Sequence, residues 1–153
     1  MGKEIERKFL VVDEQWRAAD GTKYRQGYLS TDKERTVRVR IAGNKAMLTI
    51  KGITQGASRA EYEYEIPVED AEELLDLCQR PIIEKWRHEI EHAGMTWEVD
   101  EFFGDNQGLV LAEVELDSPD EAFDLPPWVG KEVTDDPRYF NANLVHHPFR
   151  NWP

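Results

Sequence analysis

The feature that most constrains this chain is an alternation of charged and apolar residues that recurs in segment after segment. In the first segment, Glu4, Glu6 and Lys8 alternate with Ile5 and Phe9. Successive side chains of a β-strand point to opposite faces, so a period of two predicts strands with one ionic and one apolar face. The ionic faces consist almost entirely of Glu, Asp, Lys and Arg, whereas an ordinary solvent face would mix in Ser, Thr, Asn and Gln.

Eight segments have this character, and Gly, Pro and Asn residues separate them. They are Glu4–Val12, Tyr24–Ser30, Thr36–Ile41, Ala46–Lys51, Ala60–Pro67, Ile82–Glu91, Thr96–Phe103 and Leu109–Asp117. Gly43-Asn44 and Ala93-Gly94 are suited to tight hairpin turns. Helices are fewer. Amphipathic spacing predicts one over Glu69–Gln79, and shorter helices are expected over Pro119–Phe123 and Asn141–His147.

Two architectures explain the alternation. In a sandwich, the ionic faces point to water and the apolar faces meet in the core. In a closed barrel, the ionic faces line a tunnel and helices cover the apolar outside. A single strand favours the sandwich, but seven such strands together favour the barrel, which also removes exposed sheet edges. The predicted fold is α+β and predominantly β: a closed eight-stranded antiparallel β-barrel with a few helices packed outside, formed by residues 1–153 as a single domain.

Composition and charge limit which partners and which cellular location the chain can have. The chain has 153 residues and a net charge of −12, which repels nucleic acid and anionic membranes. No apolar run approaches the roughly 20 residues of a membrane helix, and the N-terminal region has no apolar signal-peptide core. The single cysteine, Cys78, excludes an internal disulfide. We therefore expect a cytoplasmic protein with no nucleic acid and no membrane as partner, and the sequence leaves a homodimer open.

A tunnel lined by these residues would hold too much negative charge without added cations. Nine acidic side chains of the ionic faces would share it, and two like charges ~4 Å apart repel by about 4 kcal/mol at an effective dielectric of ~20. Mg²⁺ prefers carboxylate and water oxygens and commonly links a protein carboxylate to a substrate phosphate. Arg38 and Arg40 lie on the same face of one strand, and Lys85 and Arg87 on the same face of another. The two members of each pair are about 6.6 Å apart along the strand, a spacing that suits an elongated polyphosphate.

The order of the motifs resembles the CYTH family, the triphosphate tunnel metalloenzymes. The opening Glu4-Ile5-Glu6-Arg7-Lys8 reads ExExK, which looks like the family's signature. The segments that agree in order are Val37-Arg38-Val39-Arg40, Leu48-Thr49-Ile50-Lys51, Arg59-Ala60-Glu61-Tyr62-Glu63, Glu84-Lys85-Trp86-Arg87, Glu98-Val99-Asp100, Glu113-Val114-Glu115 and the closing stretch from Gly130 to Asn141. The chain is similar to the short bacterial members that hydrolyse inorganic tripolyphosphate.

The resemblance implies a role for each matching residue. The triphosphate would be held by the bases Lys8, Arg38, Arg40, Lys51, Lys85 and Arg87. Mg²⁺ or Mn²⁺ would be bound by Glu4, Glu6, Glu113 and Glu115, supported by Glu61, Glu63 and Asp100. Catalysis would involve Glu4, Glu6, Lys8, Tyr28 and Lys85. The role of the C-terminal segment stays open, because some relatives carry a lysine just after the Arg138-Tyr139 position and this chain does not.

The leading functional prediction is a metal-dependent hydrolase that cleaves inorganic tripolyphosphate, or another triphosphate, and releases phosphate inside the tunnel. A class IV-type adenylate cyclase and a thiamine or nucleoside triphosphatase are the enzymatic alternatives. The non-enzyme alternative is a polyphosphate-binding module. The sequence has no Walker loop, GxGxxG, GxSxG, HExxH or CxxC motif, so it points to none of the chemistries that these motifs support.

Overall fold

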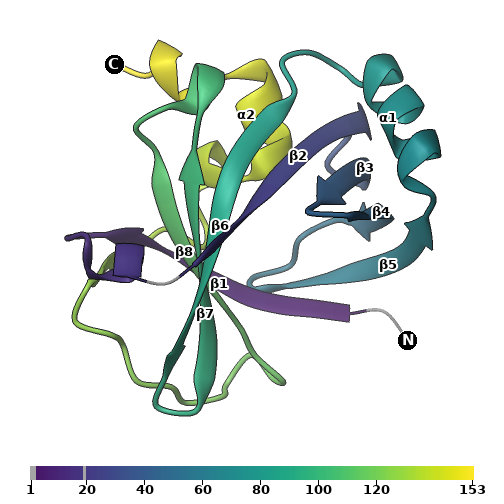
Figure 1. Cartoon of the computed structure of the whole chain (residues 1–153). Coiled ribbons are helices and arrows are strands. Elements are labelled where there is room, and N and C mark those ends of the chain that lie inside the picture. The colour runs from purple at the N-terminus through teal and green to yellow at the C-terminus, as the bar shows by residue number, and fades with distance from the viewer. Residues whose placement is uncertain (1–2, 19) are drawn as a thin grey trace.

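The computed structural model describes residues 3–18 and 20–153. Within them lie nine β-strands and two α-helices (Figure 1). The strands are β1 (Lys3–Val11), β2 (Gly21–Ser30), β3 (Arg35–Ala42), β4 (Lys45–Gly52), β5 (Ser58–Ile66), β6 (Ile83–His92), β7 (Met95–Phe102), β8 (Val110–Glu115) and β9 (Val129–Glu132). The helices are α1 (Val68–Leu77) and α2 (Asn141–His146).

Eight of the strands close into an antiparallel barrel. They follow the order β1-β8-β7-β6-β2-β3-β4-β5, and β5 returns to pair with β1 (Figure 1). The closing contact is short, because it joins only residues 3–5 to residues 58–60. The prediction of a closed eight-stranded antiparallel barrel is confirmed. Strand β9, which was not predicted, pairs with β1 farther along, where Phe9 lies opposite Glu132.

The two predicted hairpin turns are present. Gly43 and Asn44 join β3 to β4, and Ala93 and Gly94 join β6 to β7. Gly43 has φ of 60°, while Ala93 and Gly94 have φ of 51° and 81°. Positive φ in a two-residue loop matches the right-handed twist of the flanking strands, which is why Gly and Asn favour such turns. The turns fix the register of both hairpins, and with it the face on which each charged side chain lies.

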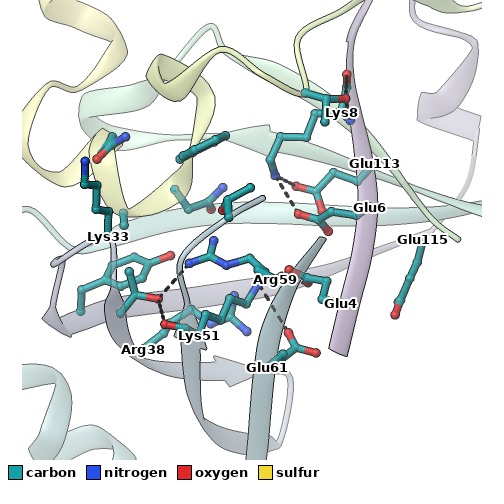
Figure 2. Close-up of a pocket in the computed structure, with 18 of the residues that line it drawn as sticks. Glu4, Glu6, Lys8, Lys33, Arg38, Lys51, Arg59, Glu61, Glu113 and Glu115 are labelled. Atoms are coloured by element: carbon teal, nitrogen blue, oxygen red, sulfur yellow. Dashed lines mark hydrogen bonds and ion pairs between the residues drawn. The ribbon is translucent and has the colours of Figure 1, made fainter. Parts of the chain in front are cut away.

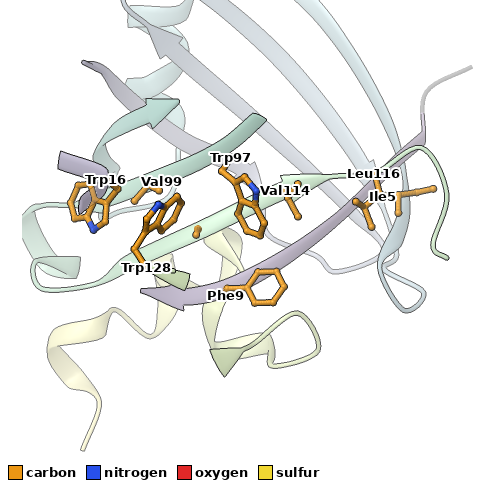
Figure 3. Packing of buried hydrophobic residues seen from close by; sticks show 9 residues of the cluster. Ile5, Phe9, Trp16, Trp97, Val99, Val114, Leu116 and Trp128 are labelled. Atoms are coloured by element: carbon orange, nitrogen blue, oxygen red, sulfur yellow. The ribbon is translucent and has the colours of Figure 1, made fainter. Parts of the chain in front are cut away.

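The apolar faces of the strands pack outside the barrel. On the outer side of β1, β7 and β8, a buried cluster contains Phe9, Trp97, Val114, Trp16 and Trp128 (Figure 3). Phe123, from the segment between β8 and β9, packs against this cluster. A fully buried large apolar side chain contributes roughly 1.5–3 kcal/mol, so these outer clusters provide much of the driving force for folding. Most of the inside of the barrel is thereby left to polar side chains.

Helix α1 covers another part of the outer surface. Its Ala71 and Leu75 pack with Val39, Ile41 and Ala46 of β3 and β4. This helix matches the predicted one to within two residues at each end. In the described residues, no helix is long and apolar enough to cross a membrane.

The helix expected over Pro119–Phe123 is absent, and that prediction is wrong. The segment forms a turn in which the carboxylate of Glu121 accepts a hydrogen bond from the backbone N–H of Asp117. Phe123 packs instead against Phe9 and Trp97. A helix of five residues is too short to repay the cost of its nucleation, so tertiary packing decides the conformation here.

The inward faces change character along the strands. On β6, the inward side chains are charged at Arg87 and Lys85 but apolar at Ile83. The inward faces of β7 and β8 likewise end in apolar residues, Phe102 and Leu111. These apolar side chains form a buried cluster with residues of α2. Helix α2, predicted over Asn141–His147, therefore lies across one end of the barrel rather than along its side (Figure 1).

Candidate active site

The ionic faces of the strands surround one cavity of about 520 Å³ (Figure 2). This volume is in the range of small-molecule sites. Every predicted site residue except Asp100 lines it. These are Glu4, Glu6, Lys8, Tyr28, Arg38, Arg40, Lys51, Glu61, Glu63, Lys85, Arg87, Glu113 and Glu115. The barrel, and not the sandwich, is therefore the correct reading of the alternation.

One side of the cavity, here called the carboxylate side, is formed by Glu4, Glu6, Lys8, Lys51, Glu113 and Glu115. Strands β1 and β8 set its geometry, because Lys8 lies opposite Glu113 and Glu6 lies opposite Glu115. The ammonium of Lys8 donates to Glu113 at 2.5 Å and lies 3.3 Å from Glu6. Burial opposes the charge on Lys8, but these two carboxylates outweigh burial and raise its pKa.

Lys51 extends this arrangement from β4. Its Nζ atom lies 2.8 and 3.0 Å from the two carboxylate oxygens of Glu4, and 3.5 Å from Glu61. Glu115 lies farther out and is exposed, at the edge of the group in Figure 2. Partial burial and the nearby carboxylates of Glu4 and Glu6 raise the pKa of Glu115. The carboxylate side therefore has negative charge in excess of what its two lysines compensate.

The carboxylate side has the donor chemistry for a hard divalent cation. Carboxylate oxygens are the ligands that Mg²⁺ and Mn²⁺ prefer. The ammonium of Lys8 already bridges Glu6 and Glu113, which marks a position of strongly negative potential. Among the described residues, no three carboxylate, imidazole or thiol groups form a ready-made metal shell. Lys8 and Lys51 hold the glutamates in the present arrangement, so binding of a metal ion by these glutamates would require the lysine side chains to turn away.

The opposite side, here called the cation side, is formed by Arg38, Arg40, Lys85 and Arg87. Asp100 lies beneath it, fully buried, and does not line the cavity. The guanidinium of Arg87 binds Asp100 through two hydrogen bonds of 2.7 and 2.8 Å, and Lys85 Nζ donates to the same carboxylate at 2.7 Å. One carboxylate is thus shared by two cations. Burial opposes its charge, but Arg87 and Lys85 outweigh burial and hold the pKa of Asp100 well below its usual value.

The remaining charge on the cation side is only partly compensated, by Glu63 at 3.5 Å from Arg38 and by Glu98 at 3.3 Å from Arg87. Burial, reinforced by Arg87 and Arg40, lowers the pKa of Lys85 to about 7. Burial and the nearby guanidinium groups of Arg38 and Arg87 lower the pKa of Arg40 to about 10. Arg38 is buried, and its Nε atom has no hydrogen-bond partner among the described residues. An anionic ligand would stabilise the charged forms of Lys85 and Arg40 and could accept a hydrogen bond from Arg38.

Neutral groups hold several of these cations in place. Arg40 Nε donates to Gln26 Oε1 at 2.8 Å, and Arg38 donates to Thr49 at 3.2 Å. The guanidinium groups of Arg40 and Arg87 each lie 4.8 Å from the centre of the Tyr24 ring. Hydroxyl, amide and aromatic partners orient a cation without cancelling its charge.

Sequence reasoning missed several residues of the cavity. They are Tyr24, Lys33, Arg59, Thr134, Asn141 and Asn143. Tyr24 lies four residues before Tyr28 on β2, so the period of two placed both on one face and could have found it. Lys33 lies in the loop between β2 and β3, where no period exists (Figure 2). Asn141 lies on α2, whose position across the end of the barrel depends on tertiary packing.

Comparisons with known proteins agree with this geometry. The CYTH domain profile matches residues 2–147. An inorganic triphosphatase of Acetivibrio thermocellus is 53% identical, covering 99% of each chain, and one of Nitrosomonas europaea is 40% identical, covering 93% of this chain and 96% of that protein. The crystal structure of the inorganic triphosphatase NE1496 aligns with a TM-score of 0.65 at 37% identity, covering 92% of this chain and 96% of that one. The chain belongs to the CYTH domain family.

Proposed function

We propose that this chain is a metal-dependent inorganic triphosphatase that hydrolyses tripolyphosphate to pyrophosphate and phosphate. The observation that carries the proposal is a single cavity in which buried bases, only partly compensated by acidic partners, face a cluster of glutamates. Two whole-length relatives named inorganic triphosphatase support the same substrate class. The proposed enzyme is a single domain over residues 1–153.

The cation side is the proposed binding site for the phosphate chain. Arg38, Arg40 and Arg87 offer guanidinium groups, which suit phosphate oxygens, and Lys85 offers a more compact charge in its protonated form. Lys8 and Lys51 would reach the same chain from the carboxylate side. A phosphate chain of high negative charge competes for these ammonium groups, so its binding would free Glu4, Glu6 and Glu113 from them.

The freed carboxylates are the proposed metal ligands. The triphosphatases of this family are metal-dependent. We propose Mg²⁺ or Mn²⁺ at Glu4, Glu6, Glu113 and Glu115, with Glu61 and Glu63 in support. A bound divalent cation would neutralise charge on the phosphate oxygens and favour ionisation of a water. Asp100, which is buried beneath the bases, would orient Lys85 and Arg87 rather than touch the metal.

Lys85 is the proposed proton acceptor. A group whose pKa lies near the operating pH is well suited to general acid–base work, and the pKa of Lys85 is about 7. In the proposed step, a water oxygen forms a bond to a terminal phosphorus while the bridging P–O bond breaks. The water proton passes to the neutral Lys85 amine, and pyrophosphate leaves. Tyr28 lines the same cavity and is proposed to orient the substrate or the water.

A substrate panel tests the proposed function. Phosphate release would be measured from tripolyphosphate, ATP and thiamine triphosphate with Mg²⁺ or Mn²⁺, together with cyclic AMP formation from ATP. We expect the highest kcat/KM with tripolyphosphate and no activity after chelation. Cyclic AMP as the main product would favour the cyclase, and a higher rate with a nucleoside or thiamine triphosphate would favour those alternatives. Tight binding without turnover under every metal would leave the polyphosphate-binding module.

The proposed setting is the cytoplasm, with a small triphosphate as partner. A net charge of −12 opposes association with nucleic acid and anionic membranes. A homodimer is compatible with this proposal, and the molecular mass in solution would decide it.

A further inference from the structure

One amide group of α2 reaches the cation side of the cavity. The Oδ1 atom of Asn141 accepts hydrogen bonds from Lys85 Nζ at 3.0 Å and from Gln26 Nε2 at 2.9 Å. Gln26 Oε1 in turn accepts from Arg40 Nε at 2.8 Å. Gln26 and Lys85 are both almost completely buried. A continuous hydrogen-bonded chain therefore connects α2 with cations on two strands, β6 and β3.

The direction of this chain is fixed by its two ends. Lysine and arginine side chains donate hydrogen bonds and do not accept them when charged. The atom of Asn141 that faces Lys85 must therefore be its oxygen, and the atom of Gln26 that faces Arg40 must be its oxygen as well. The amide nitrogen of Gln26 is then left to donate to Asn141, as observed. Each member of the chain has only one orientation that satisfies its neighbours.

The same contacts fix the orientation of the Lys85 nitrogen. Lys85 Nζ also donates to Asp100 Oδ2 at 2.7 Å. The nitrogen has four tetrahedral positions, of which one is bonded to carbon and two are directed at Asp100 and Asn141. The last position remains for the cavity that Lys85 lines. It carries an N–H when the group is charged and the lone pair when it is neutral.

The acceptor on α2 is neutral, unlike the acceptors on the carboxylate side. Lys8 is held by Glu113 and Glu6, which cancel its charge. Asn141 holds Lys85 without adding a negative charge. The charged groups that face Lys85 from the surrounding strands are Asp100 on β7, Arg87 on β6, Arg40 on β3 and Glu113 on β8.

Resting on the proposed function, we propose that Asn141 is a positioning residue for Lys85. Its amide oxygen, together with Asp100, directs the free position of the Lys85 nitrogen into the cavity. Because the amide is neutral, it leaves the positive charge of the neighbouring Arg40 and Arg87 available to the triphosphate and does not favour the ammonium of Lys85 as a carboxylate would. Helix α2 thereby completes the active site as well as covering one end of the barrel.

The pH dependence of turnover in two variants tests this role. Phosphate release from tripolyphosphate with Mg²⁺ would be measured for the full chain, Asn141→Ala and Asn141→Asp. In Asn141→Ala the nitrogen is held by Asp100 alone, so we expect the plateau value of kcat to fall about tenfold at every pH. Asn141→Asp keeps an acceptor at the same place. We expect its plateau to stay within about twofold of wild type, with the ionisation moved to higher pH and a raised KM, because a carboxylate stabilises the ammonium and repels the substrate.

Val145→Ala is the matched control on the same helix. Val145 is buried in the cluster beneath α2, so its truncation loosens the packing of the helix without removing a contact to Lys85. We expect a lower melting temperature with wild-type kcat and an unchanged pH profile. A wild-type plateau in Asn141→Ala, or the same loss of kcat in Val145→Ala, would overturn the positioning role.

A second readout does not require turnover. The titration of Lys85 would be followed by NMR on protein labelled at lysine Cε, with Lys85→Arg used to assign the signal. Relative to wild type, the midpoint should move to lower pH in Asn141→Ala and to higher pH in Asn141→Asp. Identical midpoints in all three proteins would overturn the proposal. A wild-type protein that releases no phosphate from tripolyphosphate would instead reject the proposed function, and the NMR titration would still decide the role of Asn141.

Discussion

The two sides of the cavity hold their cations by different means. On the carboxylate side, Lys8 and Lys51 are bound by glutamates at 2.5 and 2.8 Å. On the cation side, Arg40 and Lys85 are bound in part by the amides of Gln26 and Asn141. The consequence appears in the pKa values of Lys8 and Lys85, one lysine from each side. The pKa of Lys8 is raised because Glu113 and Glu6 outweigh its burial, whereas burial and neighbouring cations lower the pKa of Lys85.

This difference shows how, under the proposed function, one small barrel could bind two ligands of opposite charge, a metal cation and an anionic phosphate chain. Under the proposed function, acidic partners would keep the lysines of the carboxylate side in place until a phosphate chain and a metal ion exchange with them. On the cation side, neutral amides orient Arg40 and, together with Asp100, Lys85, so that less of the positive charge is cancelled there. Removing a carboxylate should therefore affect the chemistry and spare the fold, and removing a base should affect either proton transfer or substrate capture.

The largest effect is expected from the carboxylate side. Glu6→Gln removes a proposed metal ligand while preserving the shape of the side chain, so kcat should fall by about 1,000-fold, or roughly 4 kcal/mol. The melting temperature should fall only modestly and the fold should persist, because Glu6 also pairs with the buried ammonium of Lys8, which keeps its closer partner Glu113. Phosphate release and thermal unfolding measure both. Glu65→Gln, on an exposed residue outside the cavity, is the control that should leave kcat unchanged. Equal rates for the two variants would remove the carboxylate side from the mechanism.

The second largest effect is expected at Lys85. Lys85→Met should lower kcat by about 100-fold, a typical contribution of general acid–base catalysis. In the wild type, kcat/KM should rise as the pH passes through about 7, because the neutral amine is the active form. Lys85→Met should lack this rise. A wild-type profile that falls through the same pH would mean that the ammonium, and not the amine, is the working form.

The same residue links stability to pH. The folded-state pKa of Lys85, about 7, lies below its unfolded value of about 10.4. Between these values the unfolded state binds the additional proton, so the contribution of Lys85 to stability increases as the pH rises from 7 toward 10. The difference in unfolding free energy between Lys85→Met and wild type should therefore shift in favour of wild type over this range. Urea unfolding at pH 6, 8 and 9.5 measures it, and a constant difference would contradict the depressed pKa.

A smaller effect is expected where a base only captures substrate. Arg40→Ala should raise KM for tripolyphosphate about tenfold, or roughly 1.4 kcal/mol, and change kcat little. Arg25→Ala is a matched control, because Arg25 lies one residue from Gln26 on β2 but pairs with Glu72 of α1 outside the cavity. A change in kcat larger than the change in KM would place Arg40 in the chemistry rather than in binding.

The smallest effect on activity is expected from the outer clusters. Leu75→Ala in α1 removes a fully buried side chain and should cost about 2–4 kcal/mol of unfolding free energy. Below the melting temperature, kcat and KM should match those of wild type, since Leu75 packs outside the barrel. A matching loss of kcat would mean that the outer packing and the cavity are coupled.

Much of the fold and most of the site could be predicted because period-two alternation is a local property. The strand segments and the two hairpin turns were recovered, and all but one of the predicted site residues line the cavity. The predictions failed where no local period exists. Pro119–Phe123 is not a helix, β9 was not predicted, and Lys33 and Asn141 come from a loop and a short helix.

The sequence by itself determined which faces are ionic and which are apolar, because side-chain direction in a strand alternates with position. Only the tertiary structure decided which ionic groups meet. Asp100 lies beneath Lys85 and Arg87, and not in the cavity wall, because the register of β6 against β7 places Arg87 directly opposite it. Asn141 meets Lys85 because α2 packs on apolar residues of the strands, among them Ile83 and Leu111. Partners of this kind depend on barrel closure and long-range packing, which no local pattern of residues encodes.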